Sequence, residues 1–153
     1  MALAEGEVGE FKGGVEYTAV TTCLTVTCKL AGVGDHYVGG HLSLQAPADK
    51  LDSSQVLPEM KKLIKGRETS TLHLAGKLDR WSEKYLEKPL FAWSGNTAVK
   101  QYDKLPDLTG GGALASTILF KLLDLNVDDI DDDTKFPKTE FEEREGAFTI
   151  RLN

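Results

Sequence analysis

The chain has 153 residues, of which 41% are hydrophobic and 27% charged, a composition that favours an ordinary globular protein over a disordered or fibrous one. The formal net charge is −6 and the 18 basic residues are scattered, so we do not expect nucleic acid as a partner. No apolar run approaches the roughly 20 residues of a membrane-spanning helix. The first residues lack the basic and apolar blocks of a signal peptide, which predicts a cytoplasmic protein, with export that needs no signal peptide left open.

Two cysteines are too few for a disulfide scaffold, and they do not complete a zinc site with the three scattered histidines. We therefore expect reduced thiols, no metal and no cofactor. The length fits a single domain over residues 1–153, in which residues 1–10, rich in Gly and Glu, form a loose N-terminal arm.

The chain then alternates between polar and apolar residues. A short strand is expected over Phe11–Tyr17, and a half-buried strand over Val20–Leu30. In the second of these, one face carries Leu24, Val26, Cys28 and Leu30, and the other carries Cys23, Thr25, Thr27 and Lys29.

A turn over residues 31–35 separates this strand from a second alternating run, so the two are predicted to pair as a hairpin. Its inward side carries Val38, Leu42 and Leu44, and its outward side His41, Ser43 and Gln45. A helix is predicted over residues 53–65, with Asp52 or Ser53 as N-cap and Gly66 as its stop. Its buried face carries Val56, Leu57, Met60, Leu63 and Ile64.

Strands and helices are expected to continue to the end of the chain. Strands are predicted over residues 69–75, 90–93, 99–102 and 147–152, and helices over residues 79–88 and 113–125. These elements predict an α/β (α+β) fold, a mixed-sheet sandwich with helices packed on the sheet in a single domain.

The predicted hairpin brings one cysteine and one histidine onto the same face. The inward residues of both strands are even-numbered, so two residues that face each other across the hairpin have numbers whose sum is even. The odd-numbered residues of both strands share the other face, and this face carries the side chains of Cys23 and His41. A turn centred near Gly32 makes them direct partners about 5 Å apart, whereas one centred on Val33 makes them diagonal neighbours at about 7 Å.

This pair is the candidate catalytic chemistry of the chain. A thiolate is the nucleophilic form of cysteine, and a neighbouring imidazolium can lower the pKa of a thiol from about 8.5. The imidazole can then protonate the leaving group. Cys28 lies among apolar residues on the opposite face and is predicted to be a core residue. We expect the pair at a sheet edge, in a shallow cleft.

The pattern around the pair resembles the cysteine-histidine protein glutamine deamidases, namely the CheD-type chemotaxis-receptor deamidases and the catalytic domains of cytotoxic necrotizing factor-like toxins. The stretches that carry the resemblance are Thr21-Thr-Cys-Leu-Thr-Val26 and Val38-Gly-Gly-His-Leu-Ser-Leu44. It implies that Cys23 attacks a glutamine carboxamide of a protein substrate, that His41 activates the thiol, and that ammonia leaves before water releases glutamate. It also implies a third residue that orients the histidine, for which Thr18 is the candidate and Thr21 the second choice. A role as a toxin or effector would follow.

Other interpretations stand beside this one. A cysteine near a histidine also arises by chance, and the chain can equally be a non-catalytic acidic binding module, an adaptor or an inhibitor. Residues 110–112 are three glycines before a predicted helix, but no Lys-Ser or Lys-Thr follows as in a phosphate-binding loop. The acidic run 128–133 lacks the glycine and glutamate of an EF-hand, which favours a solvated loop. His36 and His73 are expected to be structural.

Overall fold

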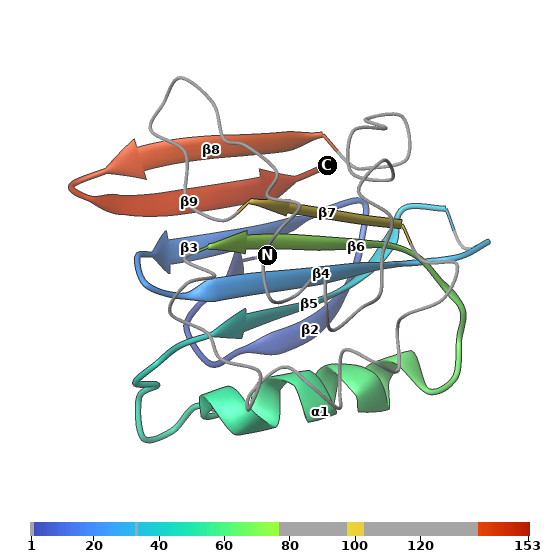
Figure 1. The fold of residues 1–153 in the computed structure, drawn as a ribbon, viewed down its shortest axis with the longest axis horizontal. Coiled ribbons are helices and arrows are strands. Elements are labelled where there is room, and N and C mark those ends of the chain that lie inside the picture. The colour runs from blue at the N-terminus through green and yellow to red at the C-terminus, as the bar shows by residue number, and fades with distance from the viewer. Residues whose placement is uncertain (1, 33, 77–97, 103–137) are drawn as a thin grey trace.

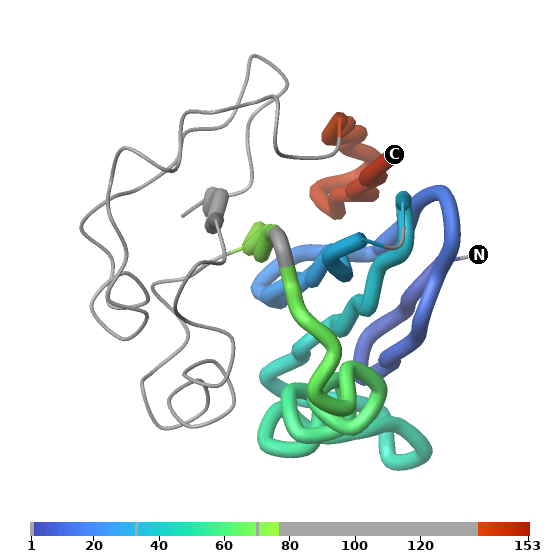
Figure 2. The backbone as a smooth tube through the Cα atoms, turned by 90° about the vertical axis from the view of Figure 1, so that its right-hand side faces the viewer, coloured from blue at the N-terminus to red at the C-terminus, as the bar shows by residue number. Residues whose placement is uncertain are grey.

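The computed structural model describes residues 2–32, 34–76, 98–102 and 138–153 (Figure 1). Within these ranges the chain forms β1 (Ala2–Leu3), β2 (Val8–Lys12), β3 (Val15–Val20), β4 (Leu24–Leu30), β5 (His36–Leu42), α1 (Ser53–Ile64), β6 (Thr69–Gly76), β7 (Ala98–Tyr102), β8 (Thr139–Arg144) and β9 (Ala147–Leu152). Helix α1 lies at one side of the strands and the β8–β9 hairpin at the opposite side, as the view turned by 90° also shows (Figure 2).

The described strands make two sheets. The larger has the order β2, β5, β4, β6, β7, and the smaller has the order β1, β3, β9, β8. Both are mixed, because β1 pairs with β3 and β6 pairs with β7 in parallel while the other pairs are antiparallel. The predicted α+β class with mixed sheets in a sandwich is therefore confirmed.

An apolar layer fills the space between α1 and the larger sheet. Its buried members are Leu24, Val26, Cys28, Leu30, Val38, Leu42, Val56, Leu57, Met60, Ile64, Leu72 and Leu74. The helix begins at a capping box, in which the Asp52 side chain accepts from the Ser54 N–H and the Gln55 side chain accepts from the Asp52 N–H. It ends at Lys65, which adopts the left-handed conformation just before Gly66. The predicted helix, its cap and the core position of Cys28 are confirmed.

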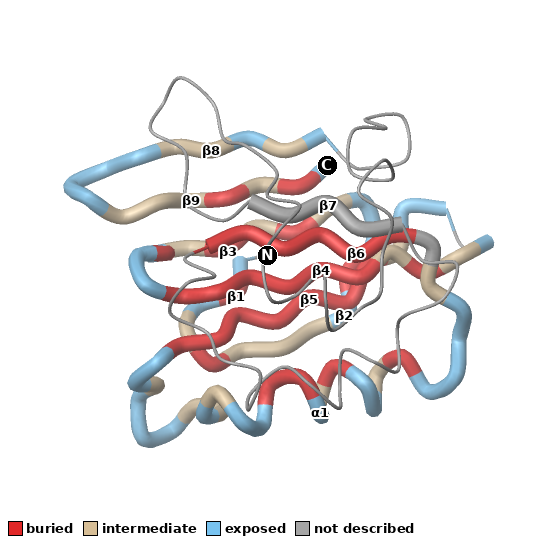
Figure 3. The backbone as a smooth tube through the Cα atoms, in the orientation of Figure 1, coloured by how far each residue is buried: buried red, intermediate tan, exposed pale blue. Residues whose placement is uncertain are grey.

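The opposite face of the larger sheet is covered by the smaller sheet, and this corrects the prediction of a half-buried hairpin. Strands β4 and β5 are buried over nearly their whole length (Figure 3). Most of the residues expected to face solvent lie instead between the sheets, although Lys29 is half-buried and Gln45 is exposed as predicted. The buried polar ones are Thr25, Thr27, His41, Ser43, Thr71 and His73. Hydrogen bonds make this burial tolerable, because Thr25 Oγ1 donates to the Ala75 carbonyl oxygen and Thr27 Oγ1 bonds to the Tyr17 hydroxyl.

The start of the chain also differs from expectation. Residues 1–10 were predicted to form a loose arm, but β1 and most of β2 fall there, and β1 is held by its parallel pairing to β3. The single strand predicted over residues 11–17 is two strands, because Gly13 and Gly14 adopt positive φ angles and separate β2 from β3. Leu44, predicted to point inward, lies beyond the end of β5 and is 43% exposed.

The last part of the chain is described only in part. The predicted strands over residues 69–75, 99–102 and 147–152 are confirmed as β6, β7 and β9. Strand β8 was not predicted; it joins β9 through a tight turn in which Glu145 and Gly146 have positive φ. The predictions for residues 79–88, 90–93, 110–112, 113–125 and 128–133 lie outside the described residues.

Candidate active site

The register of β4 and β5 decides how Cys23 and His41 are related. Thr25 pairs with His41 and Leu24 pairs with Leu42, so one step further Cys23 faces Ser43. Cys23 and His41 are therefore diagonal neighbours on one face, which is the arrangement predicted for a turn centred on Val33. Both side chains point into the layer between the sheets, where Cys23 is 2% and His41 0% exposed.

Cys23 lies in the connection between β3 and β4, at the border between interior and surface. Its two predecessors, Thr21 and Thr22, are exposed. Opposite the start of β4 stands Gly76, where a Cβ atom would collide with the carbonyl oxygen of Cys23. The glycine lets β6 approach the backbone closely at this point and so fixes the position of the cysteine.

A carboxylate that the sequence did not suggest contacts the thiol. Cys23 Sγ donates to Glu5 Oε1 at 3.6 Å, and Ser43 Oγ donates to Glu5 Oε2 at 3.2 Å. Glu5 itself is half-buried. Ser43 could have been found, because it alternates with His41 on the same strand face. Glu5 carries no local signal, because it reaches the site from a segment 18 residues before the cysteine.

The imidazole of His41 is held in one orientation. Its Nδ1 lies 3.0 Å from the carbonyl oxygen of Leu3, and because a carbonyl can only accept, Nδ1 carries the proton. The Tyr17 ring meets the imidazole edge-on, with centroids 5.9 Å apart. Nε2 is buried and has no hydrogen-bond partner among the residues that the structure describes. The site therefore holds an oriented imidazole with an unused lone pair.

The two threonines proposed to orient the histidine do not take that role. Thr18 is half-buried and follows Tyr17 in β3, so its side chain leaves the strand on the side opposite to the Tyr17 ring. Thr21 is exposed. The backbone carbonyl of Leu3 supplies the acceptor instead. Every residue has a backbone carbonyl, so the amino-acid sequence gives no sign of which carbonyl accepts the hydrogen bond.

Burial keeps both groups of the pair neutral near pH 7. It raises the pKa of Cys23 to about 11, with the Thr21 backbone acting in the opposite direction and the charge of Glu5 in the same direction. Burial also lowers the pKa of His41, against the effects of the Leu3 carbonyl and of Glu5. The expected thiolate–imidazolium pair with a lowered Cys23 pKa is thus not found. Neither is the expected sheet edge, because β4 and β5 are interior strands.

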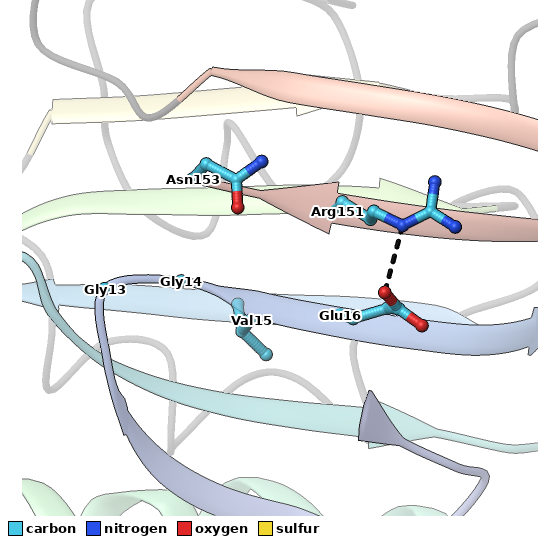
Figure 4. A pocket seen from close by; sticks show the side chains of 6 residues that line it. All are labelled: Gly13, Gly14, Val15, Glu16, Arg151 and Asn153. Atoms are coloured by element: carbon cyan, nitrogen blue, oxygen red, sulfur yellow. Dashed lines mark hydrogen bonds and ion pairs between the residues drawn. The ribbon is translucent and has the colours of Figure 1, made fainter. Parts of the chain in front are cut away.

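A hollow of about 270 Å³ lies elsewhere, where β3 begins and β9 ends, on the two inner strands of the smaller sheet (Figure 4). Its lining residues are Gly13, Gly14, Val15, Glu16, Arg151 and Asn153. Arg151, its cation, is already paired at 2.9 Å with Glu16 and at 2.9 Å with Glu142. Because both carboxylates pair with the guanidinium, Arg151 is not a free binding group for an anion in this hollow.

No group of three or more His, Cys, Asp or Glu side chains in the described ranges is placed to hold a metal ion. In the same part of the chain no helix has the length and apolar character needed to cross a membrane.

Comparison with models of known protein families yields no match to this chain, and neither does a search of curated proteins.

Proposed function

We propose that this protein is a cysteine-dependent amide hydrolase, a protein glutamine deamidase in which Cys23 is the nucleophile and His41 the base. The observation that carries the proposal is the state of His41. Its Nδ1 is fixed on the Leu3 carbonyl, and its buried Nε2 is left without a partner among the described residues, on the sheet face that it shares with Cys23. A base oriented by a third group beside a nucleophile is the arrangement that covalent catalysis requires.

The shifted pKa values favour general-base catalysis over a preformed ion pair. With the pKa of Cys23 raised and that of His41 lowered, the resting site holds a thiol and a neutral imidazole. His41 Nε2 then takes the thiol proton as the sulfur attacks the carboxamide carbon. The same proton goes to the departing nitrogen, ammonia leaves, and water hydrolyses the thioester to give glutamate. This sequence needs no cofactor.

The proposed substrate is a protein that presents a glutamine side chain, and the proposed location is the cytoplasm. A large substrate that approaches from outside is supported by the position of Cys23, which directly follows the exposed residues Thr21 and Thr22 of the β3–β4 connection. Because Cys23 is only 2% exposed and Glu5 contacts its thiol, the substrate amide would reach it only after the covering side chains move aside.

Ammonia release is the direct test. The wild-type protein, Cys23→Ala and His41→Asn are incubated with a blocked glutaminyl-glycine dipeptide and with unfolded casein. We expect release by the wild-type protein and loss of at least about 99% of it in either variant, since single positioned groups contribute factors of about 100 or more. Cys28→Ala is the matched control and should retain activity, because that thiol lies in the other core layer.

Equal release by the wild-type protein and Cys23→Ala would contradict the proposal. The chain would then be interpreted as the alternative class, a non-catalytic acidic module that binds other proteins.

A further inference from the structure

The segment Ala4–Glu7, which we call the strap, closes over the candidate site. It connects β1 to β2 and is bonded to the backbone of the candidate histidine on both sides: Gly6 N donates to the His41 carbonyl oxygen at 2.9 Å, and His41 N donates to the Glu7 carbonyl oxygen at 3.0 Å. The strap therefore runs beside His41 much as an added strand runs beside a sheet.

The strap delivers one side chain into the site. The Glu5 carboxylate lies between the two cross-strand partners, with Oε1 on Cys23 Sγ and Oε2 on Ser43 Oγ. A glutamate carboxylate has the shape and size of a glutamine carboxamide, and it is also the product of glutamine deamidation. The carboxylate that contacts the nucleophile thus has the form of the product that the proposed reaction would release.

We propose that Glu5 occupies the seat of the substrate carboxamide as an intramolecular product mimic, and that the true substrate is a glutamine in an extended segment that replaces the strap. This inference rests on the proposed function. It assigns a role to each contact: the Ser43 hydroxyl, now bonded to Oε2, donates to the acyl oxygen of the substrate, and Cys23 lies within reach of the acyl carbon.

The reaction in this seat balances without a further reactant except water. The Cys23 Sγ–acyl carbon bond forms while the thiol proton moves to His41 Nε2. The carbon–nitrogen bond breaks as His41 returns that proton to the amide nitrogen, and ammonia leaves. Water then adds to the thioester carbon, the thiol is restored, and the new carboxylate lies where Glu5 lies in the resting protein.

Two contacts with residues outside the site hold the strap in place. Lys50 Nζ pairs with the Glu7 carboxylate at 2.8 Å, and Leu51 N donates to the Gly6 carbonyl oxygen at 3.1 Å. Breaking the first contact should loosen the strap without touching the reacting groups. Lys50→Ala is therefore an opening variant, and Lys62→Ala, which removes the surface pair with Glu59 on α1, is its matched control.

The sharpest test converts the mimic into a substrate. In the variant Glu5→Gln, a carboxamide takes the seat, and we expect the introduced amide to be hydrolysed to a glutamate side chain within the same molecule. Intact-mass measurement would show the change of one amide to one acid, and peptide mapping would place it at position 5. Gln45, which is exposed on the same chain, is the internal control and should stay an amide. The conversion should vanish when Glu5→Gln is combined with Cys23→Ser.

A second variant separates this inference from the proposed function. Glu5→Ala empties the seat, and we expect Cys23 to be alkylated, and the blocked dipeptide to be hydrolysed, roughly tenfold faster than in the wild-type protein, the effect of losing a hydrogen bond to a charged group. Lys50→Ala should act in the same direction and Lys62→Ala should not.

The outcomes are distinct. Hydrolysis of the amide at position 5 that depends on Cys23 supports both ideas. If the amide at position 5 is stable but the Glu5→Ala variant hydrolyses the dipeptide, Glu5 does not occupy the position of the substrate carboxamide, and the proposed function stands. A stable amide together with no hydrolysis of the dipeptide by the wild-type protein or by Glu5→Ala overturns both, whereas an active wild-type protein with an inactive Glu5→Ala variant overturns the inference about Glu5 alone. Conversion that persists with Cys23→Ser is uncatalysed and also overturns the seat.

Discussion

Thr25 of β4 lies directly opposite His41 of β5, and this pairing sets the geometry of the candidate site. It makes Ser43 the cross-strand partner of Cys23 and leaves His41 one step along the sheet, at a diagonal distance of about 7 Å between backbone positions. The thiol therefore has a hydroxyl for its nearest partner on the sheet. In the proposed reaction, side-chain adjustment would have to bring the thiol to the imidazole.

The pH dependence of Cys23 alkylation tests the neutral resting state. Because the thiolate is the reactive form and burial raises the pKa of Cys23 to about 11, we expect iodoacetamide labelling to be slow at pH 7 and to rise with pH up to about 11. Fragment spectra that distinguish Cys23 from Cys28 give the rates separately. A labelling rate that already levels off below pH 8 would reveal a thiolate–imidazolium pair and contradict the general-base mechanism.

Serine substitutions at the two cysteines should have opposite effects on fold and activity. Cys28→Ser places a hydroxyl in the apolar layer under α1 and should lower the free energy of unfolding by about 1–3 kcal/mol, with activity retained at low temperature. Cys23→Ser keeps Glu5 as an acceptor, so we expect nearly unchanged stability and no activity. Urea unfolding followed by fluorescence measures both. An equal loss of stability in the two variants would assign Cys23 a structural role.

Acid sensitivity should depend on His41. Because burial lowers its pKa in the folded protein, the unfolded chain binds the proton first as the pH falls below about 6.5. The stabilisation is present above that pH and is lost below it, at up to about 1.4 kcal/mol per pH unit for one proton. We expect the free energy of unfolding to fall as the pH drops below about 6.5 in the wild-type protein, and His41→Gln to reduce this slope.

The control for this experiment is His36→Gln at the surface pair with Glu10, which should keep the slope because His41 is unchanged. A wild-type stability that stays flat over this range would show that His41 is protonated as readily in the folded protein as in the unfolded chain.

Alanine substitutions at two adjacent glycines of β5 should both lower stability, but only one of them should lower activity. A Cβ at Gly39 would meet the Tyr17 hydroxyl at 2.5 Å, and one at Gly40 would meet Val56 Cγ1 at 2.7 Å. Overpacking predicts a loss of about 1–3 kcal/mol for either alanine variant in urea unfolding. Gly39→Ala should also slow ammonia release, because it displaces the ring beside His41, whereas Gly40→Ala acts on the helix side. A Gly39→Ala variant with normal stability would show that Tyr17 can move aside at no cost.

The sequence was sufficient for those parts of the fold that local periodicity determines. The even-numbered apolar residues of β4 and β5 do face α1, and the Asp52 cap starts the helix as predicted. The opposite face was misjudged, because threonine, serine and histidine at alternate positions are typical of a solvent-facing surface. The sheet that covers them is built from β1, β3, β8 and β9, from the two ends of the chain, and no local pattern reports such a long-range contact.

For the site, the alternation of apolar and polar residues was sufficient to place Cys23 and His41 on one face of the hairpin. It did not determine at which residue the turn is centred. Gly32 and Gly34 both adopt positive φ, so the residues around Val33 permit more than one centre for the hairpin. The partners that orient and occupy the site, the Leu3 carbonyl and the Glu5 carboxylate, come from a segment predicted to be a loose arm. Such contacts become visible only when the tertiary structure is known.

The polar side chains buried between the sheets, beside an apolar cluster that includes Tyr17, Val20 and Ile150, have a thermodynamic consequence. Unfolding a protein exposes surface to water, and newly hydrated apolar surface raises the heat capacity while newly hydrated polar surface lowers it. The hydroxyls of Thr25, Thr27 and Ser43 and the ring of His41 belong to the second kind. The heat-capacity increment of unfolding should therefore be smaller than for an all-apolar sandwich of this size, and calorimetry should find a stability curve that is correspondingly broad and flat with temperature.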